Sequence, residues 1–332
     1  MVRNTVRKTV RNTRRNTVWN LVRRLAPLAC LAFSAASASA QIPTELMGPI
    51  SRLASVPGGG ARVIGDAVVA AVPLEEEGLE SRVEAQTRAY AMLLGLFKAA
   101  RPELETLRAD LPAGMPLDAC PGASVGRSVD GAIAVYSSPE LWRTRRRSGM
   151  TVLHRDLGGV TTDFRDTLCH GLLPAPGGEL AIDLTGSAAW IAFGLARVEQ
   201  SADPALKQAA LRSARERSRD RARRTLAAVM RGETPPEDVY PTPRLAELAR
   251  TICEAQAEYR STLIDDLAGL VVGEGRSLAR GIESGEARGV SPLTGEMLDG
   301  RWVFTILVRT VPDGAARRQI QRRVSDANPL NG

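Results

Sequence analysis

The chain has 332 residues, of which 44 are Lys or Arg and 37 are Asp or Glu, so its formal net charge is +7. The excess lies entirely in the first 40 residues, which contain eight basic side chains and no acidic one. Without them, 36 basic residues stand against 37 acidic ones, a formal charge of −1. The charge of the remaining chain therefore gives no support to nucleic acid or an anionic membrane surface as a partner, and no nucleic acid partner is expected.

The first 40 residues have the three parts of a secretory signal in the expected order. A basic stretch that ends at Arg24 precedes the uncharged run 25–33, which is too short to span a bilayer. Ala38-Ser39-Ala40 fits the small-residue rule of signal peptidase, so cleavage is predicted after Ala40. A lipoprotein anchor at Cys30 is a weaker alternative, because the apolar run before it is very short. We expect a periplasmic or secreted protein, residues 41–328, with no transmembrane segment after cleavage.

The first half of this mature region has mixed helix and strand patterns. Glu75 and its two acidic neighbours suit the N-terminus of a helix, because the helix dipole favours negative charge there. Residues 110–130 are rich in Pro and Gly and are expected to form a loop. The other predicted elements here are a helix over 44–53, a strand over 61–72, a helix over 75–100 and a strand over 131–137.

Three pairs of a capping residue and a proline mark further helix starts along the chain. They are Ser138-Pro139, Asp203-Pro204 and Thr242-Pro243. The last two are predicted to begin long helices that form an antiparallel hairpin over about 204–272, because the first helix has a row of small side chains. That row is Ala210, Ala214, Ser218 and Ala222. The remaining predictions are strands over 151–154, 179–184 and 301–311, a helix over 187–199 and a basic terminal helix.

Together these elements predict an α+β fold dominated by helices, with a small sheet and the long hairpin. The mature region has 292 residues, enough for one domain or two closely packed subdomains.

Three cysteines follow the predicted signal, and an exported protein encounters oxidising conditions. Cys120 and Cys169 both lie among Pro and Gly residues, so a disulfide between them is predicted. Cys253 lies in a helical pattern and is expected to stay reduced.

Catalytic patterns are weak. The chain has two histidines, His154 and His170, so no metal site is expected, and no motif predicts a cofactor. An unrecognised hydrolase site would draw on His154, Asp156, Asp163 and Cys169. The Gly-x-Ser-x-Gly motif of serine hydrolases does not occur, and Cys169 is followed directly by His170, whereas catalytic Cys–His pairs usually come from distant segments.

Two clusters of arginines remain. Arg143, Arg145, Arg146 and Arg147 follow a short predicted helix, where they would suit its negative end, or would form an anion-binding site. Residues 212–224 contain seven arginines and are interpreted as a solvated helix face, with i,i+4 pairs Arg212–Glu216 and Asp220–Arg224.

The sequence thus favours an exported, non-enzymatic binding, scaffold or envelope-assembly protein, whose partner is a protein or envelope component of unknown chemistry. The alternative is a hydrolase with a site near His154, Asp156 and Cys169.

Overall fold

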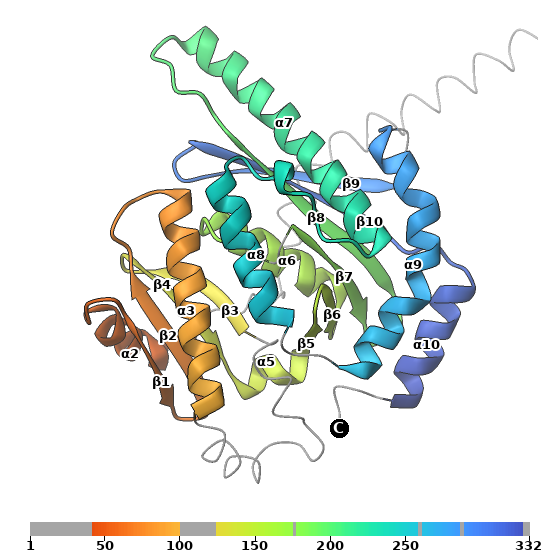
Figure 1. Cartoon of the computed structure of the whole chain (residues 1–332), viewed down its shortest axis with the longest axis horizontal. Helices are drawn as coiled ribbons and strands as arrows, with labels where there is room; N and C mark the ends of the chain where they lie inside the picture. Colours follow the sequence, from red (N-terminus) through yellow and green to blue (C-terminus); the bar gives the residue numbers. More distant parts are fainter. Residues whose placement is uncertain (1–41, 100–123, 175–176, 258–260, 286–288, 328–332) are drawn as a thin grey trace, which may run out of the picture. The chain divides into compact units, whose positions relative to one another are not determined.

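The computed structural model describes residues 42–99, 124–174, 177–257, 261–285 and 289–327, all within one compact unit, Ser39–Gly332 (Figure 1). The predicted signal and Cys120 lie outside the described residues. Ten strands form two sheets, and helices pack against both. The fold is therefore α+β, but the prediction of a helix-dominated fold with one small sheet and a long hairpin is wrong.

The first sheet is antiparallel, with the strand order β1-β2-β4-β3. Asp130 and Gly131 both have positive φ at the turn between β3 and β4, the Asp-Gly chemistry that suits a two-residue hairpin. Helices α2 and α3 cover opposite faces, since the α-carbon of Gly60 faces Leu53 of α2 while that of Gly126 faces Gln86 of α3. The elements are α2 (Thr44–Ala54), β1 (Gly60–Ile64), β2 (Ala67–Pro73), α3 (Leu79–Ala99), β3 (Ser124–Val129) and β4 (Ala132–Ser137).

Two predictions in this part need correction. The strand predicted over 61–72 is a hairpin, because Gly65 takes a positive φ and turns the chain between β1 and β2. Strand β3 lies inside the predicted loop 110–130; its buried residues complete the sheet beside β4 despite their Gly and Ser content.

The second sheet has six strands in the order β5-β6-β7-β8-β10-β9. Strands β6 and β7 are parallel and are connected by helix α6, as parallel neighbours require, while the other neighbours are antiparallel. The elements are α5 (Pro139–Thr144), β5 (Arg145–Ser148), β6 (Thr151–His154), α6 (Leu157–Cys169), β7 (Gly178–Asp183), β8 (Ala188–Arg197), β9 (Val290–Met297) and β10 (Trp302–Thr310).

Helices cover both faces of this sheet. Helices α7 (Pro204–Arg231), α9 (Thr262–Glu283) and α10 (Ala315–Ala327) share one apolar core with it, and α6 and α8 (Pro243–Ala257) share another. A short 3₁₀ helix, η3 (Glu237–Val239), precedes α8. The second core also includes Leu79 and Val83 of α3, and α3 packs against both the first sheet and α8. Among the described residues, no helix is both long enough and apolar enough to cross a membrane.

The helix predicted over 187–199 is strand β8, which lies inside the six-stranded sheet. Nine of its ten residues are buried, because helices cover both of its faces. A strand that is covered on both faces is apolar at nearly every position and shows no alternation of apolar and polar residues. The periodicity of apolar residues therefore cannot distinguish such a strand from a buried helix.

The predicted hairpin fails because the segment after residue 242 forms two helices, α8 and α9. The row of small side chains on α7 is buried, as Ala214, Ser218 and Ala222 are fully covered, but it faces the sheet. Ser218 shares a 2.7 Å hydrogen bond with Thr305 of β10. The end of α7 does pack closely on a helix, since a side chain at Gly275 of α9 would collide with the carbonyl oxygen of Met230.

Candidate functional site

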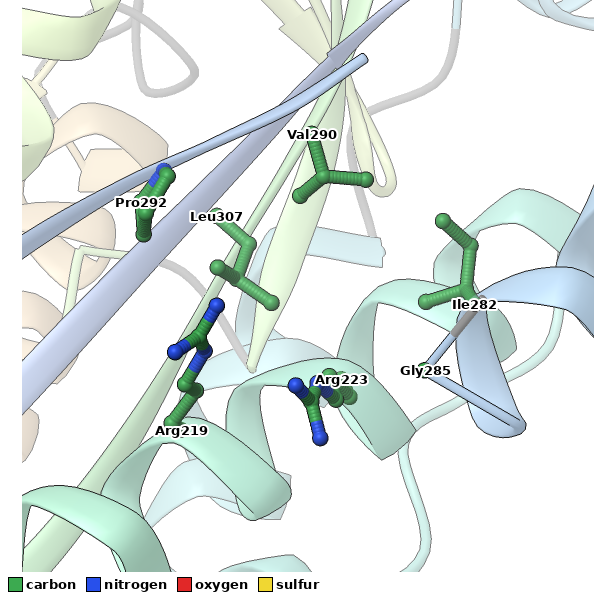
Figure 2. Close-up of a pocket in the computed structure, with 7 residues that line it drawn as sticks. All are labelled: Arg219, Arg223, Ile282, Gly285, Val290, Pro292 and Leu307. Atoms are coloured by element: carbon green, nitrogen blue, oxygen red, sulfur yellow. The ribbon is translucent and has the colours of Figure 1, made fainter. Parts of the chain in front are cut away.

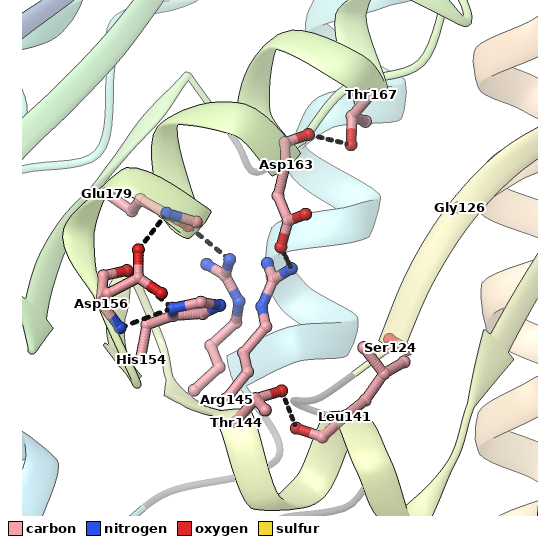
Figure 3. Close-up of polar contacts among 12 residues, drawn as sticks. Ser124, Gly126, Leu141, Thr144, Arg145, His154, Asp156, Asp163, Thr167 and Glu179 are labelled. Carbon is pink, nitrogen blue, oxygen red and sulfur yellow. Dashed lines mark hydrogen bonds and ion pairs between the residues drawn. The ribbon is translucent and has the colours of Figure 1, made fainter. Parts of the chain in front are cut away.

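The residues predicted to carry catalysis or anion binding lie around β5, β6 and α6 (Figure 3). Asp156 caps α6 by accepting a 2.5 Å hydrogen bond from the backbone N–H of Gly159, so the helix begins directly after β6. Its second turn brings Asp163 to Arg145 of β5, where the side chains form a 3.2 Å ion pair that is about nine-tenths buried. Arg145 also lies opposite His154 in the sheet.

A second ion pair lies two residues further along β5. The guanidinium of Arg147 binds the carboxylate of Glu179 on β7, and their side chains are 3% and 0% exposed. A buried pair of this kind adds little net stability, but removing one partner leaves an uncompensated charge in the protein interior.

The four predicted anion-binding arginines are consequently not gathered on one surface. Arg145 and Arg147 share one face of β5 and are each neutralised by a carboxylate, whereas alternation places Arg146 on the other face. Arg143 lies in the last turn of α5 and is exposed. These positions give no support to an anion site built from this cluster.

The ring of His154 is held by its own loop. Its Nδ1 atom lies 2.7 Å from the backbone oxygen of Asp156 and 3.1 Å from the backbone nitrogen of the same residue. Burial lowers the pKa of His154, and the nearby Arg145 lowers it further, against the opposing effect of Asp163. A side chain on Gly159 would come within 2.5 Å of the ring, which explains a glycine in the first turn of α6.

Cys169 lies at the opposite end of α6 from His154. Thirteen helical residues separate the two ends by about 20 Å. Burial and the nearby Asp166 raise the pKa of the Cys169 thiol, which disfavours the nucleophilic thiolate. In the part of the chain that the structure describes, no serine hydroxyl or thiol has a hydrogen bond to His154, so the hydrolase residues are not assembled into a nucleophile–base pair.

No disulfide joins Cys169 and Cys253 among the described residues, and the predicted partner of Cys169, Cys120, lies outside them. The described residues also contain no group of three His, Cys, Asp or Glu side chains that could hold a metal ion.

Polar side chains near Arg145 surround a cavity of about 20 Å³, room for about one water molecule. They are occupied by internal contacts. Ser124 donates a 2.7 Å hydrogen bond to the Tyr90 hydroxyl, Thr167 donates one of 2.7 Å to the backbone oxygen of Asp163, and the Gln86 amide bonds both backbone polar groups of Leu173. This cavity is part of the interior and not a ligand site.

A different pocket opens between α7, α9 and the edge of the six-stranded sheet, and we call it the arginine pocket (Figure 2). Its volume is about 70 Å³. Arg219 and Arg223 of α7 form one side, and the strands contribute aliphatic side chains across from them (Figure 2). The described residues that line it are Arg219, Arg223, Ile282, Gly285, Val290, Pro292 and Leu307.

The two arginines belong to a row of three at four-residue spacing, Arg215, Arg219 and Arg223. Arg215 is neutralised by Glu296 of β9 through a 3.0 Å ion pair. Neither Arg219 nor Arg223 has a hydrogen bond or ion pair with any residue that the structure describes. Two like charges at this spacing destabilise a helix by about 0.2–0.5 kcal/mol. Among the residues that the structure describes, the pocket thus has two positive charges without a counter-charge beside an aliphatic surface.

The arginine pocket was missed in the sequence. The arginines of 212–224 were interpreted as a solvated face, and β9, which supplies Val290 and Pro292, was not predicted at all. The sequence does contain one signal for this pocket. Arg215, Arg219 and Arg223 recur every four residues, which places three cations on one helix face, and no acidic residue belongs to that row.

Comparison of the chain with protein-family models, with curated proteins and with solved structures finds no match.

Proposed function

We propose that this chain is an exported, non-enzymatic binding protein and that it binds an anionic ligand in the arginine pocket. The observation that carries the proposal is the pair of guanidinium groups, Arg219 and Arg223, which line an open pocket and have no carboxylate partner among the described residues. Guanidinium groups bind carboxylate and phosphate oxygens through paired N–H donors, so an anion is the ligand that this charge favours.

The alternative, a hydrolase, has less support. His154 is bonded to its own loop, Cys169 lies at the far end of α6, and the nearby arginines are engaged in buried ion pairs. His154 and the two arginines are therefore held by structural contacts, and Cys169 lies too far from His154 to form a nucleophile–base pair with it.

Titration of the full chain with acetate and with inorganic phosphate, followed by NMR, tests the anion site. Shifts are expected at the backbone amides of Gly285 and Val290. Arg219→Gln and Arg223→Gln should each weaken binding about tenfold, as expected for loss of a charge-assisted contact. Arg212→Gln is the matched control, because Arg212 is an exposed arginine on the same helix outside the pocket. Equal affinity in all four proteins, or no shift at Gly285 and Val290, would refute the proposed site.

Export rests on the signal pattern of residues 1–40 and is tested separately. Mass spectrometry of material collected outside the cytoplasm of a producing cell should find a chain that begins at Gln41. A chain that still carries residues 1–24 would contradict it.

A further inference from the structure

The lining of the arginine pocket also indicates which class of anion fits. Apart from the two arginines and Gly285, every lining residue has an aliphatic side chain. Leu307 and Ile282 are almost fully buried and form part of the apolar core beneath α7 and α9, so the pocket floor is continuous with the protein interior. Val290 is partly buried and packs against the same core.

This surface offers few hydrogen-bond donors besides the guanidinium groups. The backbone N–H of Gly285 is used within the end of α9, where it donates to Ile282, and Pro292 has no N–H. A phosphate group has several oxygens that need donors, and none of the described lining residues has a hydroxyl or amide side chain to supply them. A carboxylate has two oxygens in one plane, which match the planar N–H pairs of a guanidinium.

Resting on the proposed function, we propose that the ligand is an aliphatic carboxylate, whose carboxylate group lies between Arg219 and Arg223 and whose chain covers Leu307, Ile282 and Val290. The arginines supply the charge, and the strand and helix residues supply an apolar surface that an inorganic anion would leave exposed to water. A pocket of about 70 Å³ fits a short chain, not a long acyl tail.

A series of ligands separates the contribution of the charge from that of the chain. The probes are acetate, butanoate and hexanoate, with hexanamide as the uncharged match for hexanoate, and inorganic phosphate as the anion without a chain. Affinity should rise about threefold to fourfold for each methylene that becomes buried, until the pocket is full. Hexanamide should bind at least tenfold more weakly than hexanoate, because it has no charge to pair with the arginines.

Variants locate the binding. Arg219→Gln and Arg223→Gln should weaken hexanoate binding about tenfold and leave hexanamide binding unchanged, whereas Arg212→Gln should change neither. Thermal melts of each variant confirm that the fold is retained, which is expected because Arg219 is exposed and neither pocket arginine has a hydrogen bond or ion pair with a described residue.

The outcomes are distinct. Hexanoate that binds no more tightly than acetate, while acetate and phosphate still depend on the two arginines, would overturn the aliphatic ligand and leave the anion site standing. Hexanoate binding that is insensitive to both arginine variants, or the absence of binding by every probe, would overturn the ligand class and the proposed function together.

Discussion

The close approach of α7 to the sheet can be tested with one added methyl group. Gly194 of β8 lies directly beneath the row of small side chains on α7. A β-carbon built at this position would lie 2.1 Å from the backbone oxygen of Ser218 and 2.4 Å from the backbone nitrogen of Ala222. Both obstacles are main-chain atoms in a helix, so they cannot rotate away. In Gly194→Ala, α7 has to move outward by about 1 Å to restore normal contact distances.

The cost follows from what that shift disturbs. Overpacking of a closely packed core costs about 1–3 kcal/mol, and the upper end applies here because the obstacle is backbone. The 2.7 Å hydrogen bond between Ser218 and Thr305 would also be stretched, with a loss of about 1 kcal/mol. The free energy of unfolding should therefore fall by about 3–4 kcal/mol. For a protein of this size that corresponds to a fall in Tm of about 6–16 °C.

The same chemical change at Gly269 is the matched control. Gly269 is exposed in the interior of α9, and a β-carbon there would meet no atom within 4 Å. Gly269→Ala should stabilise the protein by about 0.5–1 kcal/mol, because alanine loses less conformational entropy in a helix. Thermal and urea unfolding of the two variants should move in opposite directions. A Gly194→Ala protein within about 1 °C of the wild type would refute the packing of α7 on β8 described above.

Two further predictions concern buried ionisable groups. Glu179→Gln should lower the free energy of unfolding, measured in urea, by about 3–5 kcal/mol, because it leaves the charge of Arg147 buried without a counterion. The control is Glu237→Gln, which removes an exposed ion pair and should cost less than about 1 kcal/mol. Equal effects of the two substitutions would contradict the buried pair. Burial lowers the pKa of His154 and of His170 in the folded state, so below about pH 6.5 the unfolded chain binds more protons and the protein loses stability as the pH falls. His154→Gln should reduce the loss measured between pH 7 and pH 5, and an unchanged pH dependence would show that the ring titrates equally in both states.

Local signals in the sequence were sufficient where a residue acts on its neighbours. Asp203 accepts a hydrogen bond from the backbone of Ala205, Ser138 accepts one from Leu141 and Thr242 accepts one from Leu245, so all three predicted caps are confirmed. Strand β10 was also predicted, because Trp302 begins a run of alternating apolar residues there. In each case the chemistry that decides the structure lies within a few residues.

Packing partners were not predictable in the same way. The small residues Ala214, Ser218 and Ala222 indicate that something approaches α7 closely, and that inference is correct. The partner of α7 is strand β8, where Gly194 leaves room for the close approach of the helix backbone. The continuous apolar run of this segment predicts a helix, so the sequence does not identify it as the partner. The row of small residues and the short connector to the next helix favour a helical hairpin, but neither identifies a partner in a strand that is distant in the sequence.

The arginine pocket illustrates the same limit for charge. Local spacing predicted two ion pairs on α7, and one of them, Asp220–Arg224, is present at 3.5 Å, while Arg212 and Glu216 form no ion pair in the described structure. The arginine that is neutralised instead is Arg215, and its partner, Glu296, lies 81 positions away on β9. Which cations of a basic helix stay unpaired is thus decided by the strand that packs beside it. Strand β9 brings a carboxylate to the first arginine of the row, and the side chains it contributes to the pocket beside the next two are aliphatic. Among the described residues, the same strand therefore neutralises Arg215 and leaves Arg219 and Arg223 beside an apolar surface. A ligand that satisfies both features needs an anionic end and an apolar end, which is the physical basis for expecting an aliphatic carboxylate there.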